Sequence, residues 1–331
     1  MTGTLAITET GSAVGNLLVG TWKGGFEATS GDPADFSSWL GNSVEEENVW
    51  SVGKTVNGNE LIGSHSWIKL RTPGDSTFRT VLTIGTQGGF VISGGIVYAA
   101  TFSGLYTSSD EGETWAQTPT DCEPFDFSSI PTEAPGTGVP KPPDGAKYCD
   151  GPVTHMHVLD DGSLLAFYMG WGGAHLLANG NDPLLPESWE ALPSFQDSTT
   201  CDSGFCHTYD AAMLGDYLYV AFQSLPMVRI NWNEKLTWEQ VTVGVDSTSG
   251  NDLHPTGLTT RNSATLFAST SDGLYQSTDG ETWVRVADDA CSSRNTPHLL
   301  SRGLVDFTDT STNTNVLVIG TVRGPWIYRD A

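Results

Sequence analysis

The sequence predicts an all-β fold built from a repeated sheet unit, and three observations support this prediction. Short apolar-rich runs of strand length alternate with turn sequences such as Asn57-Gly58 and Asp161-Gly162. No stretch shows the apolar period of an amphipathic helix. A hairpin motif also recurs at distant places in the chain, which is typical of repeat architectures.

The recurring motif has the form Ser-x-Asp-x-Gly-x-Thr-Trp and occupies residues 108–115. A second copy, one residue shorter, spans 277–283, and the strands before the two copies, from 96 and from 266, also match. The Ser and Asp side chains are expected to bond to the amides of a tight turn that needs glycine, while Trp covers the sheet edge. These residues resemble the Asp box of the sialidase-like, or BNR-repeat, β-propellers. The resemblance implies a propeller of antiparallel sheets with Asp-box hairpins.

Weaker copies of the unit set the number of repeats. Residues 61–78 align without a gap to 98–115, and 17–26 match 317–326. The anchor residues, one per copy, are Leu18, Leu61, Tyr98, Leu165, Tyr219, Phe267 and Val318. The 331 residues divided over seven copies give about 47 each. The sequence therefore predicts one domain, residues 1–331, folded as a single seven-bladed β-propeller.

Each blade is expected to have four strands, with an aromatic plug on the outermost one. The plugs are Trp39, Phe78, Trp115, Trp189, Trp238 and Trp283. Ring closure leaves two alternatives for the segment from Thr4 to Glu9. It either supplies the outer strand of the last blade, which we favour, or forms the inner strand of the first blade and leaves the last blade with three strands.

The chain is strongly acidic, with 39 Asp and Glu against 15 Lys and Arg and a net charge of -24. Such a surface repels nucleic acid and anionic membranes, so neither is expected as a partner. No apolar run is long enough for a membrane span, and the first residues lack the features of a signal peptide. The composition favours a soluble protein from an extracellular, periplasmic or particle-surface setting.

Five cysteines leave one unpaired if two disulfides form. Cys122 and Cys149 bracket a Pro- and Gly-rich segment, and Cys201 and Cys206 bracket a short turn. We expect both pairs to be disulfides in an oxidising compartment, with free buried thiols as the alternative.

The longest loops are expected on one rim of the ring, the top face, where they would form the walls of a pocket. These loops are 118–152, 193–206, 244–252 and 288–297.

Six of the seven histidines are expected at this same top face, because most of them open inner strands. The six are His65, His155, His157, His207, His254 and His298. Neutral imidazoles that converge near the axis suit copper, iron or zinc. The sequence thus predicts a metal-dependent enzyme with a histidine cluster at the top of the central channel. The reaction would be oxidative, lytic or hydrolytic on a small or saccharide substrate. The structural alternative is that each histidine only bonds to the next blade.

Asp210 and Tyr209 follow His207 and are the candidate catalytic residues. Substrate contacts are expected from the top-face side chains Trp22, Phe102, Trp171 and Arg323. Two other functions stay open, a glycan-binding or glycoside-cleaving protein and a non-catalytic interaction platform. Sialidase activity itself is disfavoured, because those enzymes use three arginines and residues 1–70 contain none.

Overall fold

The computed structural model of the chain describes residues 4–9, 17–21, 24–28, 39–41, 48–118, 152–169, 173–193, 195, 207–222, 225–245, 252–270, 272–286, 304–309, 314–321 and 324–329. Within these residues the fold is all-β, with no α-helix, and the short 3-10 helix η4 spans Pro186–Ser188. No helix in this part of the chain is long and apolar enough to cross a membrane.

The described strands form seven antiparallel sheets, and strands that are consecutive in the chain are neighbours in each sheet. Three sheets contain β1 (Thr4–Glu9), β2 (Leu17–Thr21), β3 (Gly24–Ala28) and β4 (Trp39–Gly41); β5 (Ser51–Lys54), β6 (Glu60–Gly63), β7 (Ile68–Arg71) and β8 (Arg79–Leu82); and β9 (Thr86–Ser93), β10 (Ile96–Thr101), β11 (Gly104–Ser108) and β12 (Ala116–Gln117).

The next three sheets, also of four strands, contain β13 (Val153–Val158), β14 (Leu164–Tyr168), β15 (Ala174–Leu177) and β16 (Trp189–Ala191); β17 (Thr208–Leu214), β18 (Tyr217–Phe222), β19 (Leu225–Asn231) and β20 (Trp238–Val241); and β21 (Gly257–Arg261), β22 (Thr265–Thr270), β23 (Gly273–Ser277) and β24 (Val284–Arg285). The last sheet has three strands, β25 (Leu304–Asp309), β26 (Thr314–Thr321) and β27 (Gly324–Arg329).

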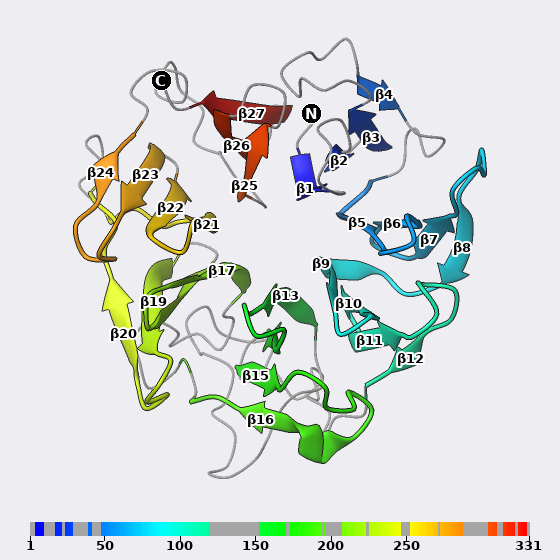
Figure 1. Ribbon diagram of the computed structural model, residues 1–331, viewed down its shortest axis with the longest axis horizontal. Helices are drawn as coiled ribbons and strands as arrows, with labels where there is room; N and C mark the ends of the chain where they lie inside the picture. The colour runs from blue at the N-terminus through cyan, green and yellow to red at the C-terminus, as the bar shows by residue number, and fades with distance from the viewer. Residues whose placement is uncertain are drawn as a thin grey trace, which may run out of the picture.

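The sheets surround a common axis, with the first strand of each sheet innermost (Figure 1). Each inner strand contacts the inner strands of the two neighbouring sheets, and β1 contacts both β5 and β25. The first and last sheets are therefore neighbours, and the ring is continuous around the axis.

From the sequence we favour Thr4–Glu9 as the outer strand of the last sheet. The structure does not show this pairing. β1 pairs with β2 in its own sheet, with Ile7 opposite Val19, and the last sheet keeps three strands. The favoured alternative was wrong because Thr4–Glu9 lies next to β2, where a hairpin connection makes local pairing available at little entropic cost.

The apolar core lies in layers between adjacent sheets rather than in one central mass. Between the β13 and β17 sheets, Leu165 and Phe167 pack with Val220 and Phe222, and all four side chains are buried. The predicted anchor residues all lie on the second strand of a sheet, namely β2, β6, β10, β14, β18, β22 and β26. These strands are covered on both faces by neighbouring sheets, which explains their continuous apolar runs.

The two best-matched hairpins share the same hydrogen bonds after β11 and β23. Ser108 Oγ donates to Asp110 Oδ1 (2.7 Å) and accepts from the Gly112 amide (2.8 Å). In the second copy Ser277 Oγ donates to Asp279 Oδ1 (2.9 Å) and accepts from the Gly280 amide (2.8 Å). Each buried serine thus satisfies a turn amide that the sheet ladder leaves free.

We predict that Ser108→Ala and Ser277→Ala each lower the free energy of unfolding by about 1–2 kcal/mol, because each leaves a buried turn amide without its acceptor. Urea denaturation measures the loss. The control variant Ser76→Ala changes an exposed serine and should match the wild type. Losses no larger than that of the control would show that these turns are held by other contacts.

Candidate functional site

Four inner strands carry a β-bulge near their first residues: β1, and the three neighbours β9, β13 and β17. The bulges leave Gln87 and Gly88 extra on β9, Thr154 extra on β13 and Tyr209 extra on β17. A bulge breaks the ladder and redirects side chains, and bulges are common beside functional sites. At the start of β9, β13 and β17 the bulges therefore present, on three adjacent strands, side chains that regular strands would not.

Gly88 allows the β9 and β13 backbones to meet at this bulge. A Cβ atom at residue 88 would lie 2.5 Å from the carbonyl carbon of Thr154 and 2.7 Å from the amide nitrogen of His155. Only glycine fits such an approach. Next to this contact, Gln87 reaches past β13 to His207, with 3.1 Å between the two Nε2 atoms. This contact links the Gln87 side-chain amide to the imidazole ring of His207.

His155 and Asp210 form a second polar contact between inner strands. His155 Nε2 lies 3.4 Å from Asp210 Oδ1, and the two side chains are 17% and 13% exposed. The Asp210 carboxylate also accepts hydrogen bonds from the Ala211 amide (2.9 Å) and from the Leu258 amide on β21 (2.8 Å). This one side chain therefore joins β13, β17 and β21.

Burial sets the protonation of this pair. Desolvation, with a smaller contribution from nearby His157, lowers the pKa of His155 to about 3. Desolvation raises the pKa of Asp210 to about 7, against the two backbone amides that favour the carboxylate. Near neutral pH, Asp210 thus exchanges between acid and carboxylate beside a neutral imidazole.

We call Gln87, His155, His207, Tyr209 and Asp210 the axial site. The His207 and Tyr209 rings meet edge to face with centroids 5.3 Å apart, which completes the group.

Four buried polar atoms around the axial site have no hydrogen-bond partner among the described residues. They are Gln87 Oε1, His155 Nε2, Thr208 Oγ1 and His254 Nδ1. Each belongs to one of the first residues of an inner strand or to the loop just before it. Buried polar groups are normally hydrogen-bonded, so these atoms offer contacts to a polar ligand.

The structure places His65 and Phe102 in an aromatic group with Trp50. The His65 and Phe102 ring centroids are 4.5 Å apart, and Trp50 lies 5.7 Å from His65 and 6.5 Å from Phe102. The Phe102 amide donates to the Gly85 carbonyl (3.0 Å), two residues before Gln87. The aromatic group is therefore hydrogen-bonded to a residue that is close in sequence to Gln87 of the axial site.

The predicted histidine cluster is found only as pairwise contacts. Among the residues that the structure describes, no group of three or more His, Cys, Asp and Glu side chains is placed to hold a metal ion. The seventh histidine, His175, packs on Tyr168 instead, with ring centroids 5.2 Å apart. Several predicted residues lie outside the described part: His298, Trp22, Trp171, Arg323 and the four cysteines for which disulfides are predicted. Most residues of the long loops predicted for the top face also lie outside it.

Sequence reasoning missed Gln87 and Thr208. Gln87 precedes Gly88-Gly89, and this glycine pair was the one available signal of a close backbone approach. Thr208 carries no comparable signal, because a threonine in a strand is ordinary.

Comparison with known proteins identifies the fold alone. No family model and no curated protein matches the chain. Similar solved structures include the extracellular domain of the putative hybrid two component system BT4673 from B. thetaiotaomicron (TM-score 0.63, 13% identity). This match covers 100% of the present chain but only 38% of that domain. The WD40 β-propeller domain of Doa1 (TM-score 0.60, 8% identity) matches 99% of the chain and 93% of that domain. Streptogramin B lyase (TM-score 0.62, 10% identity) matches 99% of this chain and 94% of its own.

The ring of antiparallel sheets and these matches define the chain as a β-propeller. Because the similar structures include both a lyase and a WD40 domain, the fold alone does not assign an activity.

We predict that His157→Gln makes stability less sensitive to acid. Burial lowers the pKa of His157 to about 4, despite the opposing charge of Asp160, so its contribution to stability is present above the unfolded pKa of 6.5 and lost as the pH falls toward 4. By linkage, the wild type should lose about 2 kcal/mol more than the variant between pH 7 and pH 5. Urea denaturation at both pH values measures this difference.

Asp210→Asn provides a test of opposite sign. The raised pKa of Asp210 means that its contribution to stability decreases as the pH rises toward 7, so removal of the carboxyl should make the gain from pH 5 to pH 7 larger. Parallel pH profiles for both variants and the wild type would contradict the burial of these two groups.

Proposed function

We propose that the chain is a single seven-bladed β-propeller enzyme whose active site is the axial site. It acts on a small polar substrate by acid–base chemistry, either lytic or hydrolytic. Two observations carry this proposal: the contact of His155 Nε2 with Asp210 Oδ1, and the buried polar atoms Gln87 Oε1, Thr208 Oγ1 and His254 Nδ1, which have no hydrogen-bond partner among the described residues.

Asp210 is the proposed general acid. A catalytic acid works best when its pKa lies near the operating pH, and burial places that of Asp210 at about 7. The Leu258 and Ala211 amides hold the carboxyl group in place and stabilise the carboxylate that remains after proton transfer.

The other axial residues bind and orient the substrate. His155 stays neutral, so it can hydrogen-bond a hydroxyl or carbonyl group without carrying a charge into the site. Gln87 holds the His207 ring through its side-chain amide nitrogen and keeps its own Oε1 available as an acceptor. Tyr209 lies at the β17 bulge, where its ring packs edge to face against His207.

A saccharide substrate is the second candidate, favoured by the aromatic group of Trp50, His65 and Phe102. His65 is exposed, and Phe102 and Trp50 are partly exposed. Exposed aromatic rings suit the apolar face of a sugar. Trp22, Trp171 and Arg323 stay predicted substrate contacts from the sequence.

The finer family and setting are also proposed. The serine and aspartate bonds of the hairpins at 108–115 and 277–283 support Asp-box repeats of the sialidase-like type. The acidic composition supports an extracellular or other exposed setting, in which disulfides Cys122–Cys149 and Cys201–Cys206 would form.

The proposal is tested with protein whose histidine side chains carry ¹⁵N. A panel of neutral polyols, lactones and glycosides is screened for compounds that shift the ring resonances of His155 and His207. Compounds that bind are then followed for turnover by proton NMR. Asp210→Asn should keep the fold and reduce turnover at least about 100-fold, the usual size of a general-acid contribution.

The matched control is His175→Gln, which removes an imidazole outside the axial site. It should retain both binding and turnover. Turnover that survives in Asp210→Asn, or binding that shifts only histidines outside the axial site, would overturn the assignment.

A transition metal, copper, iron or zinc, remains a prediction from the sequence. The described residues do not by themselves supply three ligands, so a ligand such as His298 from outside this part would be needed. Elemental analysis of the purified protein tests this. A near-stoichiometric metal that is lost in the double variant His155→Ala, His157→Ala would support the metal-dependent form of the enzyme, and a metal content far below stoichiometric would remove it.

A further inference from the structure

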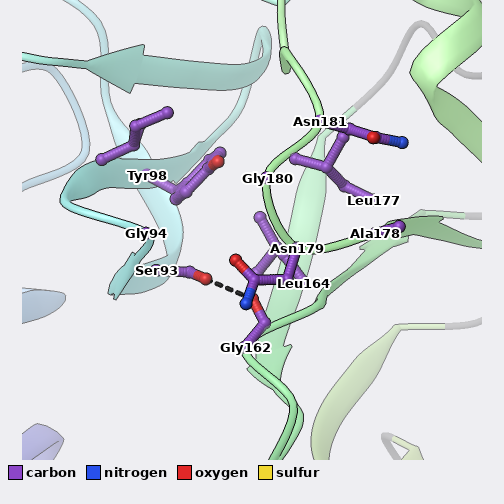
Figure 2. A pocket seen from close by; sticks show the side chains of 11 residues that line it. Ser93, Gly94, Tyr98, Gly162, Leu164, Leu177, Ala178, Asn179, Gly180 and Asn181 are labelled. Atoms are coloured by element: carbon purple, nitrogen blue, oxygen red, sulfur yellow. Dashed lines mark hydrogen bonds between the residues drawn. The ribbon is translucent and has the colours of Figure 1, made fainter.

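A small pocket lies at the opposite end of the inner strands from the axial site. It has a volume of about 150 Å³ and opens between the β9–β10 turn, the β13–β14 turn and the end of β15. Gln87 stands at one end of β9 and Ser93 at the other, so six residues at about 3.3 Å each separate the two sites by about 20 Å. Figure 2 shows Tyr98 on one side of the pocket and Leu177, Asn179 and Gly180 across from it.

The inner part of the pocket is apolar. Leu164 and Leu177 are 1% and 3% exposed and belong, with Ile96 and Tyr98, to the apolar layer between the β9 and β13 sheets. These side chains give a ligand an apolar contact surface of fixed shape.

Hydrogen bonds between the turns hold the rim. Ser93 Oγ donates to the Gly162 carbonyl, which links the two sheets directly (Figure 2). Asn179 Nδ2 donates to the Asp161 carbonyl (2.7 Å), and its backbone amide donates to Ser163 Oγ (3.2 Å). The pocket is therefore formed before any ligand binds, which lowers the entropic cost of binding.

Tyr98 is the one titratable side chain among the residues that line the pocket. It is 2% exposed, and its hydroxyl makes no hydrogen bond with the described residues. Burial, with a smaller contribution from the charge of Asp182, raises the pKa of Tyr98 to about 12. The phenol therefore keeps its proton and is available as a hydrogen-bond donor.

The charge around the pocket excludes anions as good ligands. None of the residues that line it is basic, and the one charge that acts on Tyr98 is the negative Asp182. An anionic acceptor would meet repulsion from Asp182 as well as from the net charge of -24.

We propose that this pocket is a second ligand site, which binds a compact neutral molecule with a carbonyl acceptor, such as a ketone, amide or lactam. The Tyr98 hydroxyl donates to that carbonyl, and the ring or chain of the ligand packs on Ile96, Leu164 and Leu177. The site is independent of the proposed axial activity, because it uses none of the axial residues.

The test uses 2-piperidone, a six-membered lactam, as the probe. Binding is measured by NMR titration of protein with ¹³C-labelled tyrosine rings, up to about 50 mM probe, where a millimolar site is filled. Wild-type protein should show a saturable shift of the Tyr98 resonances. Tyr98→Phe, followed through a second label on leucine methyl groups, should bind about five-fold more weakly, as expected for the loss of one hydrogen bond.

Two further variants separate the pocket from other sites. Tyr217→Phe alters a tyrosine that lies in the β17–β20 sheet, away from the pocket, and packs on Arg229 of the same sheet. This variant should leave the affinity for the lactam unchanged. Asp210→Asn should also bind the lactam as the wild type does, so that failure of the axial proposal leaves this one testable. The absence of a saturable shift at Tyr98 in the wild type, or equal affinity in Tyr98→Phe, would overturn the proposal.

Discussion

Close contact between the inner strands is the constraint on which the ring and its axial site depend. At Gly88, the β9 backbone comes so near to Thr154 and His155 that no side chain could occupy the position. This contact fixes β9 against β13 and leaves Gln87 beside the start of the next strand. The same backbone approach that closes the sheet interface therefore also assembles the polar group at the axis.

Asp210 shows the cost of building a site in this position. Removal of its carboxylate from water is unfavourable, and the Leu258 and Ala211 amides offset only part of that cost, so its pKa stays near 7. A structural bridge between sheets could use a neutral amide at lower cost. An ionisable group beside the neutral His155 is therefore the feature on which the proposed acid–base chemistry rests.

The β9 and β13 sheets contribute to both proposed sites, at opposite ends of their inner strands. At one end the bulges and polar side chains form the axial site, and at the other the turns at Ser93 and Gly162 frame an apolar pocket. The division follows from the fold, because the middle of each sheet is covered by its neighbours and only the strand ends reach the surface.

The sequence by itself determined the repeated unit, the second strand of each sheet and the hairpin turns, because these depend on contacts between residues close in the chain. The prediction that histidines begin the inner strands fits His155, the third residue of β13, but His157 is the fifth of the six residues of that strand. Only the tertiary structure decided that β1 pairs with β2, that Gln87 reaches His207, and that Asp210 meets both His155 and Leu258. These outcomes depend on strand bulges and on the distance between sheets, of which the order of the residues gives only a local sign, the Gly88-Gly89 pair, and no indication of the partner strand.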